Sequence, residues 1–455
     1  MTPSARLSRL PAAFLAAVLL ASCGATGPTA APGSPTPVPP VGTPGAPATQ
    51  APGASPSASS SSAVCDDSVE GAPAATSDAG DPDAATYTEI EAQVQKLRGI
   101  TATAPVERGV FDTAGLCAYL RQSFSAQNPA ALVKATEDLY KQLLLLPEDA
   151  SLEQLYLDLL TSQVAGLYDD ETKHMYVVSK GGGIGPVEEI TYAHEFTHAL
   201  QDQKFVLKSV VGEALDQSDR SMARSALVEG DATLLMSLWA QQHLTRDELA
   251  QVATSADPAS EAVLASMPAI LKDPLLFPYT SGLAMSLAAF TSGGFDGVNA
   301  IYANPPDSTE QLLHTDKLAA RETPIAVTFP DDLASRLGTG WKISMQDTLG
   351  EFLLGVVLGE GGAPDSTEAA AGWGGDRVAL LEGPGGEMAT VIDTTWDSTQ
   401  EATEYAKALE PFVTKLVAAG RSATVLRPAG ERAVLIVAES PDTMGRVANV
   451  LGLAG

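Results

Sequence analysis

Basic residues are scarce in this chain of 455 residues. It has 27 lysines and arginines against 56 aspartates and glutamates, which gives a formal net charge of −29 at pH 7. Binding to nucleic-acid phosphates or to anionic lipid surfaces depends on clustered basic residues, so this balance argues against a nucleic-acid partner and a polybasic membrane contact. The acidic charge mainly serves solubility.

Cysteine is scarce too, since Cys23, Cys65 and Cys117 are the three copies in the chain. None has Cys-x-x-Cys spacing, and Cys65 and Cys117 alone cannot form a structural zinc centre. In an oxidising compartment these two could form a disulfide that closes the N-terminal segment. The sequence leaves the disulfide and two separate thiols as alternatives.

The apolar run at the N-terminus, residues 11–21, is too short for a comfortable transmembrane helix. Arg6 and Arg9 precede it, and Leu-Ala-Ser-Cys ending at Cys23 follows it, which resembles a bacterial lipoprotein signal. The resemblance implies removal of residues 1–22, a lipid on Cys23, and an extracytoplasmic location on the bacterial cell membrane. An ordinary secretory signal is the alternative, and it also places the protein outside the cytoplasm.

A segment that cannot form a core follows Cys23. Residues 24–64 are almost wholly proline, alanine, glycine, serine and threonine. Such a composition buries too little apolar surface to fold and gives an extended, flexible chain. We therefore expect residues 23–84 to be a disordered, lipid-anchored tether that lifts the folded part off the membrane.

Histidine occurs only five times, and two copies lie in the sequence HEFTH, His194 to His198. Random shuffling of this composition would give His-acid-x-x-His with a probability below roughly 0.01. Residues four apart on an α-helix share a face, so both imidazoles can reach one ion, and Glu195 can face the water bound to it. The alternative is an ordinary helix with two solvated or core histidines.

The residues before the motif signal the start of a helix. Residues 181–185 form a glycine-rich loop, Pro186 suits a first helical position, and Glu188 and Glu189 fall in the first turn. Apolar side chains then recur at helical spacing. We expect a helix from Pro186 that holds both histidines against a core.

A third metal ligand is required, and Glu229 is the strongest candidate. It lies about thirty residues beyond His198 in a mostly apolar stretch with helical character. A carboxylate buried there needs a cation or several hydrogen-bond donors. The neighbouring Gly230 costs a helix about 1 kcal/mol relative to alanine, which close approach of another helix would explain. The alternative is a surface glutamate.

HEFTH followed by Glu-Gly-x-Ala in a later helix resembles the gluzincin group of zinc metallopeptidases. The resemblance covers two helices and implies that His194, His198 and Glu229 bind Zn2+ and that Glu195 is the general base. The chain departs from thermolysin-like members in its longer gap and in Thr233, which stands where they place an acidic residue that supports the ligands. Asp202 and Asp231 are candidate substitutes, with solvated carboxylates as the alternative.

Alternation over residues 164–179 predicts a β-hairpin just before the motif helix. In zincins the strand at that place is the edge along which an extended peptide lies, so the resemblance makes the hairpin the substrate-binding edge.

Peptide hydrolysis also needs a donor for the oxyanion, commonly a tyrosine or histidine from another segment. Tyr279 and His314 are the candidates for this catalytic role. A core tyrosine and a capping network at a helix end are the alternatives.

The predicted fold class is α+β. Residues 85–320 form a mainly helical, zincin-like catalytic domain with a short hairpin or sheet, and residues 321–455 form a small α+β unit without histidine. In that unit we expect a turn at residues 372–376, strands at 377–381, 389–394, 423–426 and 433–438, and helices at 398–419 and 442–451.

The sequence thus predicts a membrane-anchored, extracytoplasmic zinc metallopeptidase that acts on a peptide or protein substrate. Two alternatives remain: a non-catalytic cell-surface binding lipoprotein on a zincin scaffold, and a zinc hydrolase of a cell-wall amide. The sequence leaves the oligomeric state and the cleavage preference open.

Overall fold

The computed structural model describes residues 83–178 and 184–453. The predicted signal peptide, the predicted tether up to residue 82, Cys23, Cys65 and most of the glycine-rich loop lie outside the described residues, and the predicted end of the tether at Ala84 is the first residue of a helix. Cys117 is buried and disulfide-bonded, and because it is the only cysteine among the described residues, its partner lies outside them. The predicted pairing with Cys65 therefore stays a prediction.

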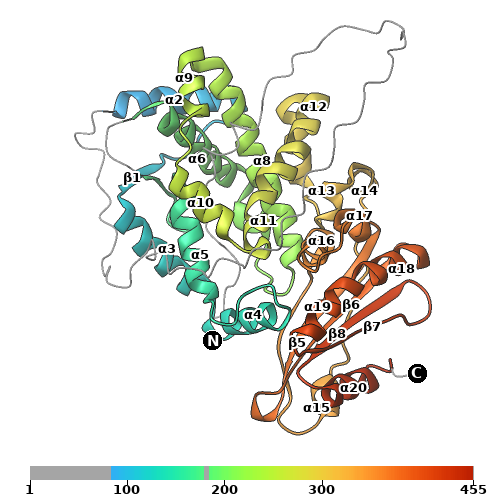
Figure 1. The fold of residues 1–455 in the computed structure, drawn as a ribbon. Helices are drawn as coiled ribbons and strands as arrows, with labels where there is room; N and C mark the ends of the chain where they lie inside the picture. The colour runs from blue at the N-terminus through green and yellow to red at the C-terminus, as the bar shows by residue number, and fades with distance from the viewer. Residues whose placement is uncertain (1–82, 179–183, 454–455) are drawn as a thin grey trace, which may run out of the picture.

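The α+β class is confirmed, with a helical N-terminal part and a C-terminal sheet (Figure 1). The N-terminal part contains the helices α2 (Ala84–Arg98), α3 (Thr113–Gln127), α4 (Ala130–Gln142), α5 (Leu152–Gln163), α6 (Pro186–Phe205), α7 (Leu207–Val211), α8 (Ser218–His243), α9 (Arg246–Ala253), α10 (Pro258–Ser266), α11 (Ala269–Phe277), the π-helical turn η1 (Pro278–Gly282), α12 (Leu283–Ala303), α13 (Glu310–Leu313) and α14 (Thr315–Ala320). None of the helices in the described ranges combines the length and apolar character that a membrane span needs.

A three-stranded sheet precedes α6 in the chain. It consists of β1 (Glu107–Phe111), β2 (Gly166–Asp169) and β3 (His174–Val178), in the order β1-β3-β2. Strands β2 and β3 pair antiparallel, which confirms the predicted hairpin, and β1 pairs parallel with β3. The strand directly before α6 is therefore the central one, and β2 is the edge strand of the hairpin.

Helices α6 and α8 pack together at the centre of the helical part (Figure 1). Residues 190–202 of α6 are buried on every side. A Cβ atom on Gly230 of α8 would lie 2.1 Å from backbone atoms of Gly282 in η1, and a Cβ on Gly282 would lie 2.1 Å from the carbonyl oxygen of Ala226. The expected close approach at Gly230 is confirmed, and it brings η1 against the face of α8 that carries Glu229.

The C-terminal part is built on an antiparallel five-stranded sheet in the order β4-β5-β6-β8-β7. Its strands are β4 (Lys342–Asp347), β5 (Trp373–Glu382), β6 (Met388–Trp396), β7 (Ser422–Leu426) and β8 (Arg432–Ala438). Its helices are α15 (Leu333–Leu337), α16 (Gly350–Glu360), α17 (Ser366–Ala370), the 3-10 turn η2 (Pro384–Gly386), α18 (Thr399–Ala408), α19 (Glu410–Ala418) and α20 (Pro441–Val450).

Two local predictions in this part were wrong. The helix expected over residues 398–419 is two helices separated at Leu409, because Pro411 has no N–H to donate to the carbonyl of Lys407. The expected turn over residues 372–376 is the start of β5, with a register shift after Trp373, whose side chain is completely buried. The other predicted strands lie within β5 to β8.

Helix α4 packs on the C-terminal sheet, although it lies far from that sheet in the chain (Figure 1). Leu139 and Leu143 share one apolar core with side chains such as Leu380 and Ile392, and the hydroxyl of Thr390 donates a hydrogen bond to Gln142. The predicted boundary at residue 320 therefore divides the chain but does not divide this core.

Candidate metal centre

Helix α6 begins at Pro186, as expected, and carries His194, Glu195 and His198. The backbone N–H of Gly185 donates to the carboxylate of Glu188, which holds the first turn. All three motif side chains are buried, with at most 1% of their surface exposed. The predicted helix is thus confirmed, and its histidines belong to the protein interior.

Glu229 of α8 completes a group of three ligand atoms that could hold a metal ion. The Nε2 atoms of His194 and His198 lie 2.8 Å apart, and Oε2 of Glu229 lies 3.5 Å from the first and 3.3 Å from the second. Ligand atoms about 2.0–2.1 Å from a tetrahedral zinc ion are about 3.3–3.4 Å apart, so the Glu229 distances fit and the imidazoles need to separate by only about half an ångström.

The pKa values of His194, His198 and Glu229 depend strongly on one another's charge. Burial and, to a smaller extent, the neighbouring His198 lower the pKa of His194 to about 3. Burial also disfavours charge on His198, but the Glu229 carboxylate outweighs it and raises the pKa to about 9. Burial acts in the same way on Glu229, and His198 outweighs it and lowers the pKa to about 2. A proton on His198 therefore occupies the role that a bound cation would take.

Gln201 orients His198, and the sequence did not single it out. The Nδ1 atom of His198 lies 2.8 Å from Oε1 of Gln201, so the imidazole donates there and directs Nε2 toward Glu229. The Gln201 amide donates in turn to Oδ2 of Asp231, at 2.8 Å. That oxygen also accepts from Arg98 at 2.9 Å and from Tyr302 at 3.0 Å. The sequence signal that could have identified Gln201 was its position three residues after His198 on the same helix.

The candidate substitutes behave differently. Asp231 reaches His198 through Gln201, whereas Asp202 accepts hydrogen bonds from Tyr168 at 3.0 Å and Lys173 at 2.5 Å. Thr233 is buried, and its hydroxyl has no hydrogen-bond partner within the described residues. Only Asp231 therefore belongs to the network behind the ligands.

Glu195 lies beside the ligands in an unusual state for a buried acid. Neither carboxylate oxygen has a close hydrogen-bond partner in the described part of the chain. Burial raises its pKa well above the usual range and Glu229 adds to this, while His198 and the backbone N–H of Tyr168 act in the opposite direction. A carboxylate held like this binds a proton readily.

The edge strand β2 passes directly over Glu195. A Cβ atom on Gly166 would lie 3.1 Å from Cγ of Glu195. The backbone N–H of Val178 donates to Ala165, and the antiparallel register then turns the backbone polar groups of Gly166 and Tyr168 away from β3, toward the free edge. Gly166, Leu167 and Tyr168 are themselves buried, so this edge lies in the protein interior beside Glu195.

The two candidate oxyanion donors lie in different places. Tyr279 is buried in η1 and forms a hydrogen bond with Glu229 of the metal group. Burial, the charges of Glu229 and Glu195, and this hydrogen bond raise the pKa of Tyr279 well above the usual range. His314 follows α13, and its Nε2 lies 2.8 Å from Oε1 of Glu351 on α16. Among the described residues, the side-chain hydrogen-bond partner of His314 is Glu351 and not a member of the metal group.

A second group of carboxylates, formed by Glu310, Glu322 and Asp397, also has ligand spacing. Lys317 already lies among them, with its Nζ 2.6, 3.0 and 2.5 Å from their oxygens. The lysine is the cation of this group, so His194, His198 and Glu229 are the better metal candidate.

Comparison with known proteins concerns the C-terminal sheet alone. A family model described as "Domain of unknown function (DUF8575)" matches residues 338–448, which span β4 to β8 and most of α20. No curated protein and no solved structure matches the chain. The matched residues do not include α6 or α8, which carry the metal group.

Proposed function

We propose that the protein is an extracytoplasmic zinc metallopeptidase that hydrolyses peptide bonds. One observation carries the proposal: two buried imidazoles and a buried carboxylate converge within 4.8 Å beside a fourth buried side chain, Glu195, that has no side-chain hydrogen-bond partner among the described residues. Such a group is costly to bury unless a cation fills it. A purely structural role for the two imidazoles and the carboxylate would leave the burial of Glu195 beside them unexplained.

The set of donor atoms favours zinc. Two imidazole nitrogens and one carboxylate oxygen suit this ion, which in catalytic sites keeps a fourth position open. A zinc ion bound by His194, His198 and Glu229 would supply Lewis acidity and lower the pKa of a water toward 7.

The protein's own side chains supply the proton transfers. Glu195, as a carboxylate whose raised pKa makes it a stronger base, accepts a proton from the attacking water and returns it to the leaving amine. Tyr279 keeps its hydroxyl proton, because burial and two neighbouring carboxylates raise its pKa, and it can donate a hydrogen bond to the developing oxyanion. Gln201 keeps His198 in one orientation throughout.

The edge of β2 favours a peptide over other amide substrates. In this proposal an extended peptide adds as a further strand along the backbone groups of Gly166 and Tyr168 that point away from β3. This would set its carbonyl groups next to Glu195, which Gly166 touches.

The decisive experiment separates metal binding from hydrolysis. We expect one zinc per chain by mass spectrometry of the purified protein, loss of zinc in His194→Ala and Glu229→Gln, and retention in the control His243→Ala on the exposed end of α8. Glu195→Gln should keep zinc but lose about 10²–10⁴-fold of its activity on a quenched fluorescent peptide library.

Two results would contradict the proposal. Full hydrolysis by Glu195→Gln would remove the base from the mechanism. Absence of stoichiometric metal from the wild-type protein would favour a binding lipoprotein that retains the scaffold. If zinc binds but peptides are not cleaved, cell-wall amides become the substrates to assay.

We also propose that Cys23 carries the lipid. Arg6, Arg9 and the residues before Cys23 support it, as described above. Labelled palmitate should enter the wild-type protein and not Cys23→Ala, and the variant should leave the membrane fraction. Equal labelling of both would contradict the anchor.

A further inference from the structure

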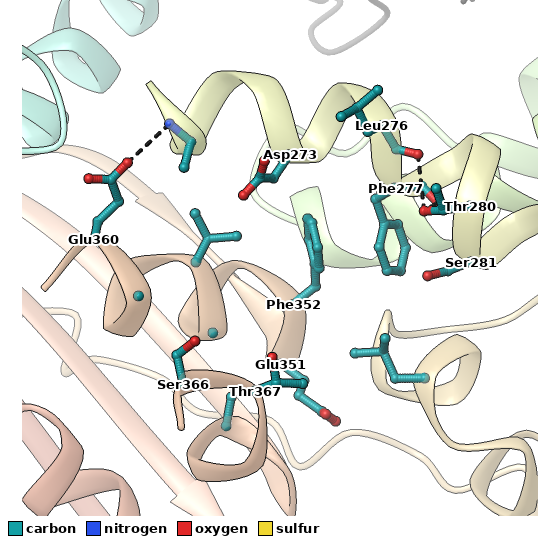
Figure 2. Close-up of a pocket in the computed structure, with 16 residues that line it drawn as sticks. Asp273, Leu276, Phe277, Thr280, Ser281, Glu351, Phe352, Glu360, Ser366 and Thr367 are labelled. Carbon is teal, nitrogen blue, oxygen red and sulfur yellow. Dashed lines mark hydrogen bonds between the residues drawn. The ribbon is translucent and has the colours of Figure 1, made fainter. Parts of the chain in front are cut away.

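A groove of about 680 Å³ lies between α11 and η1 of the helical part and α16 and α17 of the C-terminal part (Figure 2). Helices α11 and η1 form one wall, α16 forms the other, and Ser366, Thr367 and Ala370 of α17 contribute to its lining. A volume of this size is typical of ligand sites in proteins.

The two walls run antiparallel along the groove. At one end the backbone N–H of Ala269 donates to Glu360 at 3.0 Å. At the other end the rings of Phe277 and Phe352 lie 4.2 Å apart. Eight residues separate these contacts on each helix, which corresponds to about 12 Å. An extended peptide covers that length with about four residues.

The lining is apolar, with acidic groups spread along it. Phe277, Phe352 and aliphatic side chains form the apolar surface, while Asp273, Glu351 and Glu360 are its charged residues, and none of the lining residues is basic. Figure 2 shows Asp273 on α11 and Glu351 on α16, on opposite walls of the groove. The acidic groups are thus distributed along the groove and not confined to one end.

The burial of Glu351 is only partly compensated, by His314 at one of its two oxygens. Only 2% of its surface is exposed, and its Oε2 atom has no hydrogen-bond partner within the described residues, although Oε1 meets His314. Burial raises the pKa of Glu351 to about 8, and burial also raises the pKa of Asp273. Both shifts are those of acids placed where a cation would stabilise the charged form.

We propose that this groove binds a cationic amphipathic peptide segment. Its lysine or arginine side chains pair with Glu351 and Asp273, and its apolar side chains pack on Phe277 and Phe352. The proposal follows from charge complementarity and from the length of the groove. The proposal also gives His314 a role, because the hydrogen bond from its imidazole holds Glu351 at the wall of the groove.

The groove lies on the back of the turn that carries Tyr279. Thr280 and Ser281 line the groove, whereas Tyr279 meets Glu229 and Gly282 contacts α8. The two sites therefore share one helical turn and use different faces of it. Peptide binding in the groove needs no metal, so its test is independent of the proposed hydrolysis.

The test measures the affinity of the full chain for a labelled peptide by fluorescence anisotropy. The probe is fluorescein-labelled Leu-Lys-Phe-Lys-Leu, and the protein carries Glu195→Gln and is kept in EDTA so that the probe stays intact. We expect saturable binding that weakens with salt, and at least about tenfold weaker binding of the acidic peptide Leu-Glu-Phe-Glu-Leu.

Variants locate the binding. Asp273→Asn combined with Glu351→Gln should weaken binding at least about tenfold, and Thr367→Lys should do the same by placing an ammonium group in the groove. Glu368→Gln, an exposed acid of the same helix that does not line the groove, should bind like the parent. Thermal unfolding reports whether each variant is folded. If the double variant at Asp273 and Glu351 does not fold, the surface variant Thr367→Lys still tests the proposal.

Three outcomes would overturn the proposal: no binding by the parent, parent-level binding by folded Thr367→Lys, or equal weakening in Glu368→Gln. Binding that persists when His194 and His198 are both replaced by alanine supports the groove whatever the metal centre does. A failure of zinc binding or hydrolysis would leave that result unchanged.

Discussion

The helical part and the C-terminal sheet bury different kinds of side chain. Strands β5, β6 and β8 bury apolar runs such as residues 378–381 and 433–438. Around α6 and α8 the buried set includes charged or titratable groups, namely Arg98, His194, Glu195, His198, Glu229 and Asp231. Because an uncompensated buried charge costs several kcal/mol, the helical part gives up stability to hold these groups, whereas the buried acids of the sheet, Asp376 and Asp393, are paired with donors.

Buried acids also differ in how they are satisfied. Asp376 in β5 accepts hydrogen bonds from the backbone N–H groups of Leu349 and Gly350 and from the indole of Trp373, at 2.8–3.0 Å. Glu195 has no comparable set in the described part of the chain. The difference teaches that a buried acid alone does not mark a site, whereas a buried acid without donors beside two histidines does.

The largest expected effect comes from the ion pair behind the metal centre. Arg98 and Asp231 are fully buried and 2.9 Å apart. Asp231→Asn leaves the guanidinium unpaired in the interior, so we expect the free energy of unfolding to fall by about 3–5 kcal/mol. Zinc affinity should also fall about 10–100-fold, because Gln201 loses its anchor. Urea unfolding and zinc titration measure the two effects.

The matched control lies in the sheet. Arg432 and Asp393 form a two-point pair at 2.7 and 2.6 Å, but 37% of the arginine side chain is exposed. Water can replace the lost partner there, so Asp393→Asn should cost about 1 kcal/mol or less and leave zinc affinity unchanged. Equal losses in both variants would remove the contrast between the two parts.

Helix packing gives the next largest effect. Gly230→Ala places a Cβ atom 2.1 Å from backbone atoms of Gly282, so η1 must move. We expect a loss of about 3 kcal/mol from overpacking, together with weaker zinc binding, since Glu229 precedes this contact. Thermal denaturation and metal analysis test both.

Gly445 in α20 is the counterpart in the C-terminal part. No atom lies within 4 Å of a Cβ built there, and the residue lies inside a helix. Gly445→Ala should therefore stabilise the protein by about 0.5–1 kcal/mol, because alanine favours the helix. A stabilised Gly230→Ala variant would contradict the close approach of η1.

The sequence predicted the parts of the site that chemistry constrains locally. Pro186 and Glu188 marked the start of α6, the four-residue spacing of His194 and His198 fixed their common face, and Gly230 indicated a close helix contact. Each signal lies within one or two turns of the residue that it concerns. The short apolar runs of β5, β6 and β8 were predictable for the same reason.

Long-range partners could not be predicted in this way. Strand β1 forms by parallel pairing with β3, which lies more than sixty residues later. Gln201 matters because Asp231 on another helix holds it, and α4 matters to the C-terminal core because its leucines meet strands about 240 residues later. The pattern of residues along the chain does not show which distant segments meet in space. The edge position of β2 could therefore be seen only in the structure.

An effect smaller than those at Asp231 and Gly230 concerns Glu351, a buried acid at the boundary between the two parts. Its pKa is raised by burial from 4.5 to about 8. The folded protein thus holds a proton that the unfolded chain releases, and this stabilisation is fully present below pH 4.5 and lost as the pH rises through about 8. Glu351→Gln, a neutral mimic of the protonated acid, should match the wild type at pH 5.

At pH 9 the same variant should be more stable than the wild type by about 1–2 kcal/mol, less than the full shift implies, because the open groove admits solvent. Urea unfolding from pH 5 to 9 measures the difference, with exposed Glu368→Gln expected to follow the wild-type curve throughout. A constant difference across this range would mean that Glu351 is charged in the folded state. It would then resemble Asp376, held by donors, and the contrast between the boundary and the sheet would disappear.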